Sequence, residues 1–168
     1  MSQSIFEAFW KIYDESFPDD EKRDIEGQKA LLNDKDYKTI FHYDEGRLIG
    51  FLCYWNLDRF NFVEHIAIAR EFRGRGAGSL LMKNLIRLGK RIVLEVEPPE
   101  DDIKRKRIAF YEHLGFSMNE YHHVQPPLKM NANPVELRLM SHPEPLSPED
   151  VQFIEVKLQN TVYSKNTF

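Results

Sequence analysis

The 168-residue chain has a single cysteine, Cys53, and lacks any continuous apolar run of about 18 residues. One cysteine excludes an internal disulfide and a zinc site built from several cysteines. The missing apolar run predicts that no helix spans a membrane, and the first seven residues lack the basic and then apolar layout of a signal peptide. We therefore expect a cytoplasmic protein with no membrane partner and no metal.

Positive charge is also scarce, because 23 Lys and Arg stand against 27 Asp and Glu, for a net charge of −4. General nucleic-acid-binding proteins usually carry a basic excess, so we expect no nucleic-acid partner. The length and the 42% of hydrophobic residues suit one folded domain. We expect that domain to span residues 1–168, with its core at about 4–141 and a C-terminal helix at about 148–163.

The spacing of apolar residues predicts two helices, three antiparallel strands, and then alternating helices and strands. The first helix is expected over residues 4–16, capped by Ser4, and the second from about 18 to 33. The other expected elements are strands at 37–43, 47–55, 61–69, 91–96, 116–124 and 135–140, and helices at about 76–89, 103–114 and 148–163. Since a helix connects them, the strands at 61–69 and 91–96 should run parallel.

A glycine-rich stretch, Phe-Arg-Gly-Arg-Gly-Ala-Gly at residues 72–78, lies between a predicted buried strand and a predicted helix. Glycines there allow backbone N–H groups to point together at one anion, and the helix dipole and two arginines add positive potential. This arrangement predicts a phosphate-binding turn. The alternative is a tight strand-to-helix turn whose arginines lie in solvent.

Two motifs in the correct order carry a resemblance to a known family. Residues 73–78, Arg-Gly-Arg-Gly-Ala-Gly, resemble the Arg/Gln-x-x-Gly-x-Gly/Ala signature of the GCN5-related N-acetyltransferases (GNAT). Residues 110–116, Phe-Tyr-Glu-His-Leu-Gly-Phe, resemble the second marker of that family, a helical tyrosine followed by Gly-Phe. The resemblance implies an α/β (α+β) fold, in which helices flank a mixed, mostly antiparallel sheet with a splayed parallel pair at the cofactor site.

The resemblance implies acetyl-CoA as co-substrate and a small-molecule or peptide amine as acceptor, and it leaves a homodimer open. The pyrophosphate would lie on the backbone N–H groups of residues 74–79, and the pantetheine arm would pair with strand backbone exposed by the splay. The implied cofactor-binding residues are Ile66, Ala67, Ile68, Arg73, Gly74, Arg75, Gly76, Ala77, Gly78 and Ser79. The fold cannot identify the acceptor.

The same resemblance assigns Tyr111 as the general acid that protonates the leaving thiolate, the alternative being a tyrosine packed at the sheet edge. Glu64 is the first candidate for the general base and His65 the second. Neighbouring residues of a strand face opposite sides, so only one of the two should face the cleft unless a bulge shifts the register. Alternatively, Glu64 orients the amine or is purely structural.

The chain departs from the family pattern in two places. Lys104 stands where many members have an Asn, and cations at 104–107 near a helix N-terminus predict ion pairs with the acids at 100–102 or contacts with the cofactor phosphates. The usual first strand has no counterpart in residues 1–4, so the sheet should lack one edge strand or start differently.

We therefore expect transfer of an acetyl group from acetyl-CoA to a primary amine in a direct ternary complex. One alternative is a non-catalytic acyl-CoA-binding or sensor domain, and another is an interaction module that uses the C-terminal helix. Six aromatic or histidine side chains could line an acceptor pocket or be ordinary strand residues: Tyr54, Trp55, Phe60, Tyr121, His122 and His123.

Overall fold

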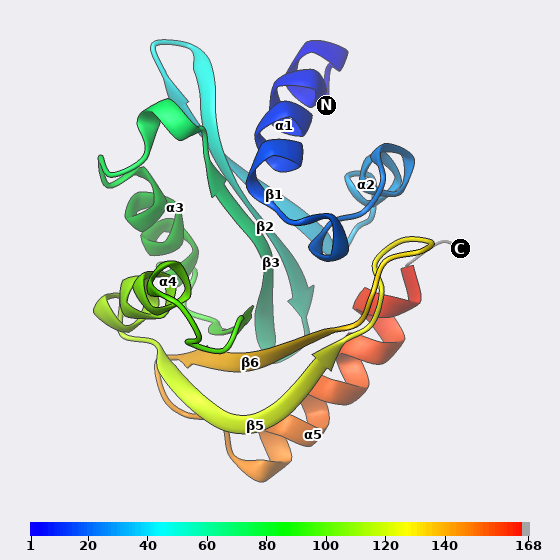
Figure 1. Ribbon diagram of the computed structural model, residues 1–168, viewed down its shortest axis with the longest axis vertical. Coiled ribbons are helices and arrows are strands. Elements are labelled where there is room, and N and C mark those ends of the chain that lie inside the picture. The colour runs from blue at the N-terminus through cyan, green and yellow to red at the C-terminus, as the bar shows by residue number, and fades with distance from the viewer. Residues whose placement is uncertain (166–168) are drawn as a thin grey trace.

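A computed structural model describes residues 1–165 and places six strands in one mixed sheet of order β1-β2-β3-β4-β6-β5 (Figure 1). The strands are β1 Tyr37–Asp44, β2 Arg47–Leu57, β3 Phe60–Ile68, β4 Arg91–Val96, β5 Ser117–Gln125 and β6 Val135–His142. The α-helices are α1 Gln3–Ser16, α2 Ile25–Leu31, α3 Ala77–Ile86, α4 Asp102–His113 and α5 Pro148–Lys157. Only the pair β3–β4 is parallel, which confirms the predicted fold class.

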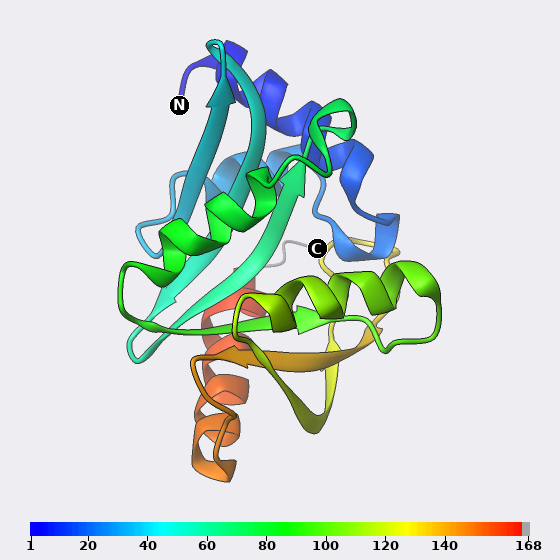
Figure 2. The same ribbon diagram turned by 90° about the vertical axis from the view of Figure 1, so that its left-hand side faces the viewer.

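Helices cover both faces of the sheet and enclose two apolar cores. On one face, α1 and α5 pack over a core that includes Phe9, Phe51 and Ile154. On the other face, α3 and α4 pack over a second core that includes Met82 and Tyr111. Figure 2 looks onto this second face, with α3 and α4 in front of the strands. Both faces of the sheet are therefore buried, as expected for strands rich in apolar residues.

The parallel pair separates after only a few residues. β3 and β4 pair from Phe60–Arg91 to Val63–Leu94, and no pairing continues beyond Leu94. On its other side β3 carries a bulge, because Cys53 pairs with His65 and Tyr54 with Val63, so that Glu64 has no partner on β2. The predicted bulge and splay are thus present, and they open the sheet from within.

The N-terminal segment differs from its prediction in two ways. The cap of α1 is Ser2, whose hydroxyl accepts from the N–H of Ile5 at 3.4 Å, and not Ser4. The continuous helix expected over 18–33 is wrong, because a short 3-10 turn, η1 (Asp19–Glu21), precedes a separate α2. Asp24 starts α2 by accepting from the N–H of Gly27 at 2.7 Å, and an Asp at this position competes with a continuing helix.

The start of the sheet and the C-terminal helix follow the sequence prediction closely. β1 is the first strand found in residues 1–165, so the sheet begins without the family's usual preceding strand. Ser147 and Asp150 form a capping box at α5, with Pro148 in the first helical position. The helix continues through a π-turn at Leu158–Val162, and its apolar side chains belong to the core.

Within residues 1–165 no helix is both long and apolar enough to cross a membrane.

Candidate functional site

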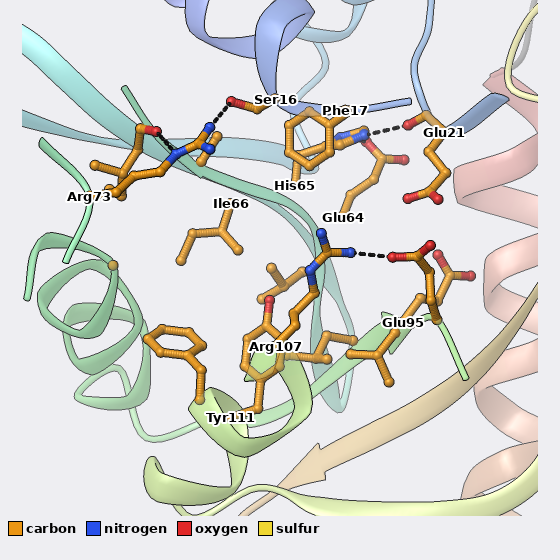
Figure 3. A pocket seen from close by; sticks show the side chains of 18 of the residues that line it. Ser16, Phe17, Glu21, Glu64, His65, Ile66, Arg73, Glu95, Arg107 and Tyr111 are labelled. Atoms are coloured by element: carbon orange, nitrogen blue, oxygen red, sulfur yellow. Dashed lines mark hydrogen bonds and ion pairs between the residues drawn. The ribbon is translucent and has the colours of Figure 1, made fainter. Parts of the chain in front are cut away.

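A cleft of about 500 Å³ opens where β3 and β4 diverge (Figure 3). One wall is β3 from Val63 to Ile68, and the facing wall is β4 from Leu94 onward together with α4. The glycine-rich turn closes one end, and the segment after α1, with Phe17 and Glu21, closes the other. The cleft therefore results from the interrupted parallel pairing, and several elements distant in sequence line it.

The glycine-rich turn has the backbone geometry of an anion site. Gly74 and Gly76 have φ values of +77° and +82°, which L-residues with a side chain rarely adopt. Gly76 is the N-cap of α3 and supplies no side-chain cap, so the first-turn N–H groups remain available. An added Cβ on Gly78 would contact the Phe110 ring at 3.5 Å. Conformation therefore favours glycine at positions 74 and 76, whereas a Cβ at position 78 would make only an ordinary contact.

Arg73 is exposed, but its guanidinium joins the end of β3 to the end of α1. Its Nε donates to the carbonyl of Ile68 at 2.9 Å, and its terminal nitrogen donates to the Ser16 hydroxyl at 3.3 Å (Figure 3). Because backbone groups alternate along a strand, Ile66 presents its N–H and carbonyl on the same cleft edge, whereas those of Ala67 face β2. Ile66 thus offers the free backbone groups of this wall.

The structure brings the predicted cofactor-binding residues together along one side of the cleft. All ten except Arg75 line it. The guanidinium of Arg75 instead lies over the Phe72 ring, 5.4 Å from its centroid. Whether these residues bind a cofactor stays a prediction, but their arrangement is the one that such a ligand needs.

Tyr111 lies between the two ends of the cleft, on α4 (Figure 3). Its ring packs between Phe110 and Phe116, with centroid distances of 5.1 and 5.7 Å. Its hydroxyl has no hydrogen-bond partner among residues 1–165, and burial raises the pKa of the phenol to about 12. The hydroxyl therefore stays protonated at neutral pH, as a proton donor must.

The two predicted base candidates converge on one neighbouring segment. Glu64 forms an ion pair with Arg23, with 2.8 Å between its Oε2 and Nη1 of Arg23. The Nε2 of His65 donates to the carbonyl of Glu21 at 2.9 Å, and its Nδ1 lies 3.5 Å from Glu64 Oε2. The predicted exception applies: the bulge at Glu64 breaks the alternation, and both residues line the cleft.

The ion pair determines the charge of Glu64. Burial alone would raise the pKa of this carboxyl, but the Arg23 guanidinium and the His65 ring together outweigh it and lower the pKa to about 2. Both side chains are almost fully buried. Glu64 is therefore ionised at neutral pH and a weak proton acceptor. Its catalytic role stays a prediction.

Three further carboxylates line the cleft, and the predicted site residues do not include them. Glu95 is buried and contacts His123 Nε2 at 2.5 Å and the Tyr163 hydroxyl. Glu97 forms an ion pair with Arg107 at 2.6 Å. Glu21, on η1, has no ion-pair or hydrogen-bond partner for its carboxylate among the described residues.

A signal for two of them is present in the sequence, because Glu95 lies on a predicted strand and Glu97 follows that strand directly, two residues further along. Glu21 has no such signal.

The six aromatic and histidine candidates for an acceptor pocket do not line the cleft. Trp55 and Phe60 are buried in the core under α1 and α5, and His123 supports Glu95 from behind. The reading of these side chains as ordinary strand residues is therefore correct.

Three of the four cations at residues 104–107 pair with nearby acids, as one of the two predictions stated. Lys104 pairs with Glu100 at 2.9 Å, Arg105 with Asp102 at 2.7 Å and Arg107 with Glu97. Asp101 caps the helix by accepting from the N–H of Lys104 at 2.8 Å. These acids offset the unfavourable helix dipole.

Comparison with known proteins agrees with this geometry. The model of the acetyltransferase (GNAT) family matches residues 2–116. YjbC of Bacillus subtilis (strain 168), which carries a provisional acetyltransferase assignment, is 36% identical over 104 residues. That match covers 61% of this chain and 53% of YjbC, so the chain spans about half the length of that relative.

Solved structures show the same fold. A provisionally assigned acetyltransferase of the GNAT family from Bacteroides thetaiotaomicron has a TM-score of 0.84 and 31% identity, covering 97% of this chain and 96% of its own. An aminoglycoside 6'-N-acetyltransferase complexed with coenzyme A has a TM-score of 0.60 and 14% identity, covering 83% of this chain and 91% of its own. At that identity the second likeness shows the fold alone.

Replacing Glu64 with Gln should lower the free energy of unfolding by about 3–5 kcal/mol, because Arg23 would remain buried without its counter-charge. Urea unfolding measures the loss. Glu149→Gln is the matched control, since it removes a surface ion pair with Arg59 and should change stability little. Equal, small losses in both variants would contradict a structural role for the buried pair.

The Glu64–Arg23 ion pair should also make the stability of the protein depend on pH. The pKa of Glu64 is about 2 in the folded protein against an ordinary 4.5. Ionised Glu64 therefore contributes fully to the free energy of unfolding at neutral pH, and this contribution is lost as pH falls from about 4.5 toward 2. A double variant with Arg23→Met and Glu64→Leu should lose less stability over that range.

Proposed function

The chain belongs to the GNAT family of acetyltransferases, and from that premise we propose that it transfers the acetyl group of acetyl-CoA to a primary amine. The observation that carries the proposal is the cleft itself. It joins an uncapped helix N-terminus, an unpaired strand edge and a protonated tyrosine hydroxyl in one continuous space. These are an anion site, an amide-pairing site and a proton donor, in that order along the cleft.

The donor end suits a coenzyme A molecule. The pyrophosphate would lie on the N–H groups of residues 74–79, where the dipole of α3 and Arg73 favour negative charge. The amide groups of the pantetheine arm would pair with the free N–H and carbonyl of Ile66, as an added strand does. The complex of a structural neighbour with coenzyme A supports this use of the fold.

The reaction requires a neutral amine, a held thioester carbonyl and a proton for the leaving thiolate. Tyr111 supplies that proton in the proposal, because its phenol is protonated at neutral pH and its hydroxyl is unoccupied. We assign Glu64 an orienting and structural role in preference to direct proton transfer. With Arg23 it ties the segment after α1 to the β3 bulge beside the proposed acceptor end.

The direct test is release of free thiol from acetyl-CoA with a panel of primary amines: lysine, a peptide with a free N-terminus, putrescine and glucosamine. We expect thiol release with at least one amine, and a mass increase of that amine by one acetyl group. Tight binding of coenzyme A by calorimetry without turnover of any amine would indicate the acyl-CoA-binding domain instead.

Replacing Gly76 with Ala should weaken coenzyme A binding at least about tenfold, because φ +82° is strained for Ala and the turn would shift its N–H groups. Gly89→Ala is the matched control. Gly89 also has a positive φ, +75°, and no atom lies within 4 Å of an added Cβ at either position, but Gly89 lies at the far end of α3. Equal dissociation constants for the two variants would contradict the phosphate-binding turn.

Tyr111→Phe should lower kcat about 100-fold on the best amine and leave the affinity for coenzyme A unchanged, because only the donated proton is lost. Tyr54→Phe removes a hydroxyl outside the cleft and serves as control. Steady-state kinetics over a range of pH measures the effect. A rate that is unchanged at every pH would refute the assignment of Tyr111 as the acid.

A further inference from the structure

Four carboxylates line the acceptor end of the cleft, and three of them are occupied by other protein groups. Glu64 pairs with Arg23, Glu95 with His123 and Tyr163, and Glu97 with Arg107. Glu21 alone, among the described residues that line the cleft, has a carboxylate without a partner. A carboxylate with free lone pairs in a partly enclosed cleft is the one available to bind a ligand cation.

The backbone that carries Glu21 is firmly held, although its side chain is free. His65 donates to the carbonyl of Glu21 at 2.9 Å. On one side Asp20 accepts from the N–H of Asn133 at 2.9 Å, and on the other Lys22 pairs with Asp14 at 2.6 Å. Figure 3 shows the Glu21 side chain extending from this segment toward the side of the cleft where Glu95 lies. The backbone position of Glu21 is therefore fixed, and its carboxylate faces the cleft.

The surroundings of Glu21 favour its protonated form more than those of Glu64 do. Burial and the nearby charge of Glu97 raise its pKa above the ordinary value, with a smaller contribution from Glu95. Arg107 and His65 also face Glu21 and oppose the shift. A carboxyl with a raised pKa accepts a proton from an ammonium group more readily than one held near 2.

A second polar group points to a ligand at this end. The side chain of Gln125, on β5, lines the cleft with the residue only 5% exposed. Its amide nitrogen has no hydrogen-bond partner among residues 1–165. Buried polar atoms are normally satisfied, so an open amide in a cleft is available to a bound ligand or to water.

We propose that Glu21 is the carboxylate that binds the ammonium group of the acceptor and accepts its proton, with Gln125 binding a neighbouring polar group of the same molecule. The inference rests on the proposed acetyl transfer and extends it to the acceptor side. It assigns the proton-accepting role to a residue on η1 instead of the strand residue Glu64.

Glu21 takes one proton from the ammonium, which frees the nitrogen lone pair, and later gives that proton to solvent. The nitrogen forms a bond with the thioester carbon, and the carbon–sulfur bond then breaks. Tyr111 protonates the departing thiolate, and the second proton lost from the nitrogen restores the phenol. The products are an N-acetylated amine and coenzyme A with a free thiol.

The test compares Glu21→Gln with Glu15→Gln, an identical change at an exposed carboxylate six residues earlier on α1. With the amine that gives the fastest thiol release, Glu21→Gln should lower kcat/KM at least about 100-fold. It should also abolish the fall of the wild-type rate at low pH, while coenzyme A affinity stays unchanged. Glu21→Asp should restore part of the rate, and Glu15→Gln should match the wild type. Wild-type kinetics and pH profile in Glu21→Gln would overturn the proposal.

A second readout does not depend on turnover. In protein carrying ¹³C-labelled Glu side chains and saturated with coenzyme A, adding putrescine should shift the Glu21 carboxyl signal and leave that of Glu15 in place. If the wild type acetylates none of the amines, the proposed function fails, and this titration alone decides on Glu21. An unmoved Glu21 signal would then refute it as the ammonium-binding residue.

Discussion

The interrupted pairing of β3 and β4 is the constraint on which the site depends. Beyond Leu94 the parallel pair stops, and backbone groups of β3 lose the partners that a continuous sheet would supply. The Glu64 bulge and its buried ion pair with Arg23 stabilise this opening from the α1 face of the sheet. A buried pair is costly to desolvate, so its presence argues for a specific role in fixing this local geometry.

The Glu64 bulge and its ion pair with Arg23 also position the end of the cleft where we propose that the acceptor binds. Because of the bulge, two consecutive residues, Glu64 and His65, both reach the segment between α1 and α2. The His65 ring packs edge-on against Tyr13 and Phe17, with centroid distances of 4.9 and 4.5 Å. That segment carries Glu21 at the cleft, so the interactions that keep the sheet open also position a free carboxylate. The cleft is consequently polarised, with N–H groups and Arg73 at one end and carboxylates at the other.

Local patterns were enough to predict the glycine-rich turn, the parallel strand pair and the position of Tyr111. Positive φ values at Gly74 and Gly76 follow from the glycines themselves, and a helical crossover requires the parallel pair. Tyr111 could be recognised because one short motif places it on a helix before Gly115. By contrast, the acceptor end depends on contacts between distant segments. Glu95 is held by His123 and Tyr163, which are 28 and 68 residues away, and no short-range spacing encodes that arrangement.

The break between η1 and α2 shows a similar limit. Residues 18–33 are polar and compatible with a helix, but Asp24 caps a new helix and Arg23 turns inward to Glu64. The energy of that distant ion pair is absent from the local sequence pattern, and therefore Glu21 could not be anticipated as a site residue.

The central claim is that the β3–β4 opening holds coenzyme A with its thiol beside Tyr111 and the acceptor on the side of Glu21. A crystal structure of the protein with coenzyme A and an acetylated amine product measures this most directly. We predict pyrophosphate oxygens on the N–H groups of residues 74–79, the pantetheine arm along Ile66, and the sulfur within reach of the Tyr111 hydroxyl. Coenzyme A bound outside this cleft, or β3 and β4 closed against each other, would contradict the claim.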